Sequence, residues 1–105
     1  MPNNDELIKR IDNSIDDLKD LIITIEGETE EKVQLRNKRN TLRGERNRLV
    51  HANIQQHSQH YLTTINALDS ASAQIQSAIG DNEQVVETIK KVTAVVDLIN
   101  ELRPV

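Results

Sequence analysis

The strongest concentration of chemically useful side chains is the stretch RNKRNTLRGERNR, residues 36–48. It holds six basic side chains and one acid, in a chain whose net charge is −4. Guanidinium groups in such a strip can bind phosphate, so one hypothesis is a nucleic-acid-binding surface. Its residues would be Arg36, Arg39, Arg43 and Arg46, which the spacing of three, four and three places on one face of a helix.

The same strip has a structural interpretation, as one wall of a seam between two helices. The arginines lie beside a stripe formed by Leu35, Leu42 and Leu49, and charges that flank an apolar stripe are typical of paired helices. Residues 1–31 hold ten acids and three bases, whereas residues 32–48 hold seven bases and one acid. We favour the seam, because the strip has no aromatic side chain to stack on bases and the protein is acidic overall.

The seam hypothesis predicts a register for the two helices. If the chain folds back near Gly27, residues whose numbers sum to about 54 lie opposite one another. Asp12 then lies near Arg43, and Asp16 lies near Lys38 and Arg39.

Other residue types offer little chemistry. His51, His57 and His60 are the only histidines, and no carboxylate between residues 46 and 68 completes a metal site with them. The carboxylates are spaced as on solvated helix faces, and the chain has no glycine-rich phosphate loop or nucleophile elbow. We therefore expect no enzymatic activity, no cofactor, no metal and no small-molecule substrate.

The sequence predicts three helices, and these carry the side chains described above. The first, at about residues 4–26, carries a heptad-like aliphatic stripe: Ile8, Ile11, Ile15, Leu18, Ile22 and Ile25. A long central helix is expected at about 29–79, with Thr29 as its N-cap. A third, at about 81–102, follows a capping box that starts at Asp81, and Pro104 ends it. Its stripe contains Val85, Ile89, Val92, Val96 and Ile99. If the chain folds back at Gly80, residues whose numbers sum to about 160 lie opposite one another.

The central segment contains a change of phase. Its apolar stripe jumps by five residues from Leu49 to Ile54, which rotates the apolar face by roughly 140°. Either the helix breaks near residues 51–58, giving four helices, or it continues and offers different faces at its two ends. We favour a continuous helix, because no Pro or Gly lies between residues 45 and 79.

Composition narrows the class of protein. The apolar residues are almost all Ile, Leu, Val and Ala, and Tyr61 is the sole aromatic, which suits thin helical layers rather than a deep ligand cavity. The chain has no cysteine, no signal-peptide pattern and no apolar run long enough to span a bilayer. We expect a cytoplasmic protein that does not associate with membranes.

These observations predict one all-α domain, an antiparallel helical bundle of coiled-coil type. With two short helices packed on the halves of a long one, part of each wide apolar stripe remains exposed, including Leu21, Val86, Val95 and Leu102. We expect these residues to form an interface, either in a homodimer or with another helical protein. The alternative is a compact monomeric four-helix bundle, formed through a break near residues 51–58. The leading functional hypothesis is a non-enzymatic interaction or scaffold protein, and nucleic-acid binding is the alternative.

Overall fold

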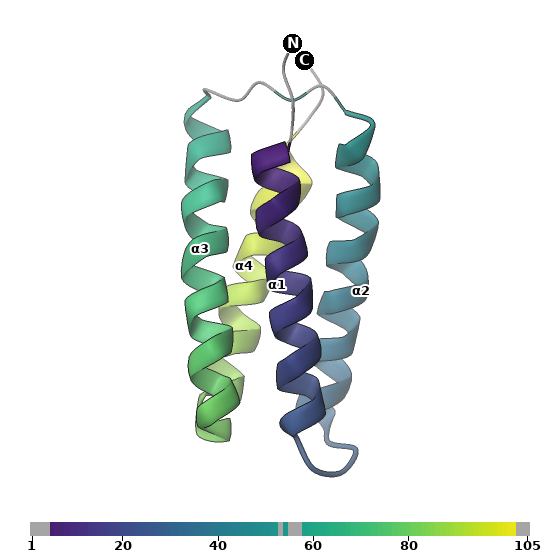
Figure 1. Cartoon of the computed structure of the whole chain (residues 1–105), viewed down its shortest axis with the longest axis vertical. Coiled ribbons are helices and arrows are strands. Elements are labelled where there is room, and N and C mark those ends of the chain that lie inside the picture. Colours follow the sequence, from purple (N-terminus) through teal and green to yellow (C-terminus); the bar gives the residue numbers. More distant parts are fainter. Residues whose placement is uncertain (1–4, 53, 55–57, 103–105) are drawn as a thin grey trace.

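Four α-helices lie side by side along the long axis of the molecule (Figure 1). The computed structural model describes residues 5–52, 54 and 58–102. The helices are α1 (Asp5–Thr24), α2 (Glu30–Val50), α3 (Gln59–Gly80) and α4 (Val85–Glu101), and a short 3-10 helix, η1 (Asn82–Gln84), precedes α4. The predicted all-α bundle is therefore confirmed.

The prediction of a continuous central helix is wrong, and the alternative break near residues 51–58 is right. α2 ends at Val50, where His51 is the C-cap, and α3 begins after Ser58, whose side chain accepts a hydrogen bond from the backbone N–H of Tyr61. The break lets Leu49 and Ile54, which a continuous helix would point in different directions, both reach the core. Residues 53 and 55–57 lie outside the described part of the chain, as does Pro104.

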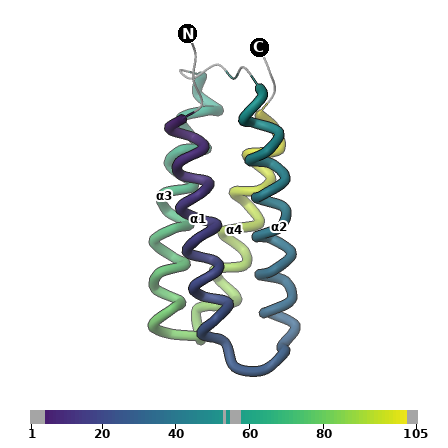
Figure 2. Tube along the Cα trace, turned by 45° about the vertical axis from the view of Figure 1, so that its right-hand side comes forward, coloured from purple at the N-terminus to yellow at the C-terminus, as the bar shows by residue number. Residues whose placement is uncertain are grey.

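The helices form two antiparallel hairpins, hairpin one (α1–α2) and hairpin two (α3–α4). α1 packs against α2 and α3, and α4 packs against the same two helices. Figure 2 shows α1 beside α3 and α2 beside α4. Polar contacts follow this arrangement: Arg10 reaches Asp69 and Asp17 reaches Gln76, so α1 and α3 run parallel in a constant register. The two hairpins therefore lie next to each other in the same orientation.

The predicted register of hairpin two, with residue numbers summing to about 160, is confirmed by contacts between its helices. Lys91 Nζ donates to Ser70 Oγ at 3.0 Å, and Gln74 Nε2 donates to Thr88 Oγ1 at 3.3 Å. The turn is tight because η1 begins directly after Asp81. As predicted, Asp81 is an N-cap, but it caps η1 rather than α4 itself.

The two hairpins bury equivalent positions. In their first helices the equivalent buried residues differ by 57 in number, as in Leu18 and Ile75. In their second helices the difference is 50, as in Leu42 and Val92. Together these positions form one aliphatic core that runs the length of the bundle.

The end of the bundle that carries both hairpin turns is here called the loop end. The numbering difference between equivalent positions falls from 57 in the first helices to 50 in the second helices, and this change affects the structure of the loop end. Leu35 of α2 is equivalent to Val85, the first residue of α4, but α2 begins five residues earlier, at Glu30. Hairpin one therefore extends beyond hairpin two at the loop end, as Figure 1 shows. The first turn of α2 therefore lies beyond the position equivalent to the start of α4.

Candidate interaction surfaces

The basic strip of α2 is divided between several partners. Thr29 caps the helix by accepting a hydrogen bond from the backbone N–H of Lys32, as predicted. Further along, Arg46 Nε donates to Asp12 Oδ1 of α1 at 2.5 Å, and Arg36 pairs with Glu28 in the α1–α2 turn. Two of the four arginines in the predicted stripe thus stabilise hairpin one, in the manner of the seam hypothesis.

The predicted register of this seam is wrong by about one helical turn. Asp12 pairs with Arg46 rather than lying near Arg43, so the opposed residue numbers sum to 58 instead of 54. The reason is the turn: α1 ends at Thr24 and α2 begins at Glu30, and the chain reverses through Gly27, whose φ is +74°. The longer turn moves α2 along α1. Among the described residues, Asp16 forms no ion pair with Lys38 or Arg39.

Three cations of the strip have no carboxylate within ion-pair distance in the described part of the chain. They are Lys38, Arg39 and Arg43. Arg43 is exposed. The Nε atom of Arg39 is buried without a hydrogen-bond partner, and its Nη2 lies 3.5 Å from Asn40 Oδ1 of the next residue. These three side chains are the part of the strip that remains available for an anion.

Arg48 has a role that the sequence analysis missed. Its guanidinium donates to the carbonyl oxygens of Ile99 at 3.0 Å and Leu102 at 2.9 Å, at the C-terminal end of α4, and it also pairs with Glu45. A cation at this position satisfies carbonyls that a helix end leaves unpaired and complements the helix dipole. The only available signal was that the last turn of α4 contains no basic residue of its own.

The expected exposure of the predicted interface residues is wrong for three of the four. Leu21 is fully buried, and Val95 and Leu102 are 3% exposed. They are covered because four helices surround one core, whereas the predicted two-helix layers would have left one side of each stripe open. Val86 is 52% exposed, as expected.

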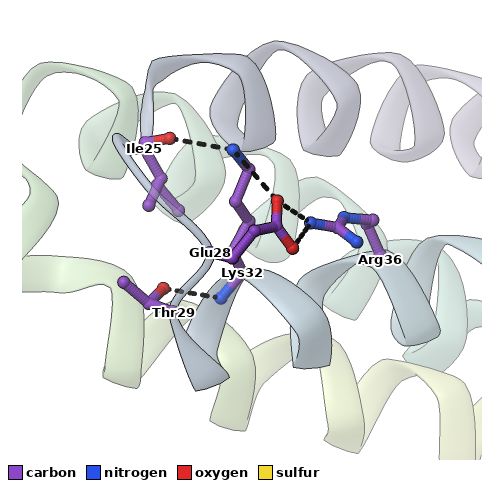
Figure 3. Close-up of polar contacts among 5 residues, drawn as sticks. All are labelled: Ile25, Glu28, Thr29, Lys32 and Arg36. Carbon is purple, nitrogen blue, oxygen red and sulfur yellow. Dashed lines mark hydrogen bonds and ion pairs between the residues drawn. The ribbon is translucent and has the colours of Figure 1, made fainter.

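Val86 lines a shallow apolar groove at the loop end, here called the loop-end groove. Its volume is about 200 Å³, and its lining residues are Ile25, Thr29, Glu31, Asn82, Val85 and Val86. The groove lies where the first turn of α2 extends past η1. Figure 3 shows how the adjoining turn is held: Lys32 Nζ donates to the carbonyl oxygen of Ile25 at 3.1 Å, and Glu28 pairs with Arg36.

A larger groove follows the contact between α1 and α3. It has a volume of about 360 Å³ and a polar lining: Arg10, Asn13, Asp16, Asp17, Asp69, Ser72 and Gln76. Beneath it, Ser14 and Ser72 place their hydroxyl oxygens 3.3 Å apart, and Ala71 and Ala78 are buried. Small side chains thus allow α1 and α3 to approach each other closely. The groove could not be predicted from the sequence, because nothing in the sequence indicated that α1 and α3 are neighbours.

Hydrogen-bonded ion pairs and burial explain the shifted pKa values of the ionisable side chains. Arg10 donates a hydrogen bond to Glu6 and thereby lowers the pKa of that carboxyl, and the same bond raises the pKa of Arg10. Arg36 lowers the pKa of Glu28 in the same way. Burial raises the pKa of the Tyr61 hydroxyl.

The described residues contain neither a cluster of side chains suited to a metal ion nor a helix suited to span a membrane. In that part of the chain, no group of three His, Asp or Glu side chains has an arrangement that would hold a metal ion. Of the predicted histidine set, His51 is exposed, His60 contacts the carbonyl oxygen of Leu98 at 2.9 Å, and His57 lies outside the described residues. No described helix combines the length and the apolar character of a membrane span.

Comparison with protein-family models, with curated proteins and with solved structures finds no match to this chain. Its function therefore has to be argued from its surfaces.

Proposed function

We propose that the protein is a small helical binding module that acts on a partner protein through its outer surface and performs no chemistry of its own. The distribution of side chains supports this. The core is aliphatic, and the buried polar side chains Ser14, Thr64 and Thr88 form hydrogen bonds within or between helices. The charged side chains lie on the surface, many of them in ion pairs between neighbouring turns or helices.

The observation that carries the proposal is the half-exposed Val86 beside the loop-end groove. An aliphatic side chain exposed singly needs no explanation, but here it continues into a hollow with the aliphatic side chains of Ile25 and Val85. An exposed aliphatic side chain beside an apolar hollow offers a partner protein a place to bury its own apolar side chains. The buried stripes predicted as the interface do not offer such surface.

Photo-crosslinking tests the proposal. A photoreactive phenylalanine analogue is placed at Val86 and, as a matched control, at the exposed position Ala94 on the same helix. We expect a discrete crosslinked product from position 86 that is absent from position 94, when the protein is expressed in its own cells. Equal crosslinking at both positions, or none, would contradict a partner at the loop end.

Self-association is a second form of the same function and retains the homodimer expected from the sequence. Light scattering at several concentrations tests it, and a monomer at high micromolar concentration would exclude it. A cytoplasmic location, also expected from the sequence, remains part of the proposal. Imaging of the tagged protein with a cytoplasmic marker tests this location.

Nucleic-acid binding is the second candidate function, favoured because Lys38, Arg39 and Arg43 have no carboxylate partner among the residues that the structure describes. Fluorescence anisotropy with RNA and DNA at low and moderate salt is the test. Phosphate contacts predict binding that weakens steeply with salt and that Arg43→Gln reduces, whereas Arg36→Gln, which removes a paired arginine, serves as the control. An absence of binding at low salt would exclude this function.

A further inference from the structure

We propose that the loop-end groove binds a cationic amphipathic helical segment of a partner protein. This rests on the proposed function, because it specifies which partner the loop end recognises. The groove is about 200 Å³, smaller than the roughly 300–1,000 Å³ of pockets that enclose small-molecule ligands. It is therefore suited to side chains that project from a larger partner.

The two hairpins end at different levels at the loop end (Figure 1). Because α2 begins five residues before the position equivalent to the start of α4, the first turn of α2 extends past α4. The floor of the resulting step is aliphatic, with Ile25 8% and Val85 5% exposed, and Val86 forms its open side. A short helical segment laid in this step would cover Val86 and place aliphatic side chains against the floor.

The charge near the groove is complementary to that of a cationic partner. Glu31 lines the groove, and on both hairpins further carboxylates lie within a few residues of its lining in the sequence: Glu26, Glu28, Glu30, Asp81, Glu83 and Glu87. Three cations pair with members of this set: Lys32 and Arg36 both pair with Glu28, and Lys90 pairs with Glu87. The surroundings of the groove are thus strongly negative. Complementary potentials favour a cationic partner and disfavour an acidic one or an anionic lipid surface.

Helix-terminal acids alone do not account for an apolar groove. Glu30 and Glu31 lie in the first turn of α2, where negative charge complements the helix dipole. That role explains their charge, but it does not explain the apolar lining of the groove beside them. An amphipathic occupant accounts for both features, because its lysine or arginine side chains meet the carboxylates while its apolar side meets the floor.

The test uses a synthetic leucine–lysine amphipathic peptide, titrated into the full-length protein and followed by amide NMR shifts. Two comparison peptides replace every lysine by glutamate or every leucine by serine. We expect saturable shifts only with the leucine–lysine peptide, centred on Thr29–Glu31 and Asn82–Val86. Binding should weaken with salt. Val86→Ser should weaken it about tenfold, since it removes a partly exposed aliphatic contact.

Ile23→Ser is the matched control, because Ile23 is 70% exposed near the same end but does not line the groove. It should leave peptide affinity unchanged. Binding of the glutamate or serine peptide with equal affinity, shifts centred on the α1–α3 groove, or an unaffected Val86→Ser variant would each overturn the inference. Concentration-dependent shifts in the same amides without peptide would overturn it in favour of a second copy of this chain.

The two proposals fail separately. If the leucine–lysine peptide does not bind but position 86 still crosslinks to a partner, the proposed function stands and the cationic helix is wrong. If neither occurs, the proposed function is wrong as well.

Discussion

Hairpin one and hairpin two reach the same packing with very different surfaces. α2 carries seven basic side chains, whereas α3 has no Lys or Arg and a single carboxylate, Asp69. Nevertheless the buried residues of the two hairpins occupy equivalent positions, for example Leu42 and Val92. The comparison indicates that the spacing of aliphatic residues determines the fold, and that the charge of hairpin one is an addition to it.

Energies support this division of roles. A fully buried aliphatic side chain contributes about 1.5–3 kcal/mol, and an exposed ion pair contributes about 0.2–1 kcal/mol. The ion pairs of hairpin one are largely exposed, including Arg46–Asp12, whose side chains are 37% and 43% exposed. They can select a register for the hairpin, but they do not hold the bundle together.

The largest expected effect comes from the equivalent core positions Leu18 and Ile75, which are both fully buried. Leu18→Ala and Ile75→Ala should each lower the free energy of unfolding by about 2–5 kcal/mol, because each leaves a cavity in the shared core. Urea denaturation followed by circular dichroism measures this. Similar losses with a single transition would show that the hairpins unfold together, and a biphasic curve in one variant would contradict a common core.

Close contact between α1 and α3 predicts a smaller effect from added volume. Ser14 and Ala71 are equivalent small residues, both about 2% exposed. Ser14→Leu and Ala71→Leu should each cost about 1–3 kcal/mol in unfolding free energy, since neither site has room for a larger side chain. Ala94→Leu, at an exposed position, is the control and should change stability by less than about 0.5 kcal/mol. A tolerated leucine at both small sites would contradict the close approach.

Two arginines of α2 should contribute differently to the free energy of unfolding. Arg48 bridges α2 to the last carbonyls of α4, so Arg48→Ala should cost about 1.5–3 kcal/mol by removing charged hydrogen bonds that join the hairpins. Arg36 is paired with Glu28 on the surface, so Arg36→Ala should cost at most about 1 kcal/mol. Thermal unfolding of the two variants measures the loss of stability in each. Equal losses would contradict the expected difference between Arg48 and Arg36.

The sequence was sufficient for what depends on local pattern. The aliphatic stripes located the helices, Thr29 and Asp81 were identified as caps, and the register of hairpin two followed from its tight turn. The sequence could not decide whether the central helix breaks, because residues 51–58 contain no Pro or Gly. The break is stabilised by tertiary burial of Ile54 and by the Ser58 cap.

The surfaces were less predictable than the fold. Contacts such as Arg48 with Leu102, and the α1–α3 groove, depend on which hairpin faces are neighbours, and that arrangement is determined by packing across the whole bundle. The exposure of Val86 followed from the pattern, but its groove did not. Equivalent positions of the two hairpins differ in residue number by 57 in the first helices and by 50 in the second helices. The groove arises from this difference of seven residues.

The smallest expected effect concerns Tyr61, at the start of hairpin two. Burial raises the pKa of its hydroxyl above the usual value of about 10, so the folded state keeps the proton at pH values where the unfolded chain has lost it. The resulting stabilisation is fully present below pH about 10 and is lost as the pH rises through the higher pKa of the folded state. Since Tyr61 is the only tyrosine, tyrosinate absorbance reports its titration directly.

Two measurements check this expectation. The absorbance midpoint should lie above that of the urea-unfolded chain, and the alkaline loss of stability should be smaller in Tyr61→Phe, which has no hydroxyl to titrate. The difference between wild type and variant isolates the contribution of the tyrosine. Coincident midpoints in the folded and unfolded chains would show that the hydroxyl is solvated, and hairpin two would then not bury Tyr61 against the start of α1.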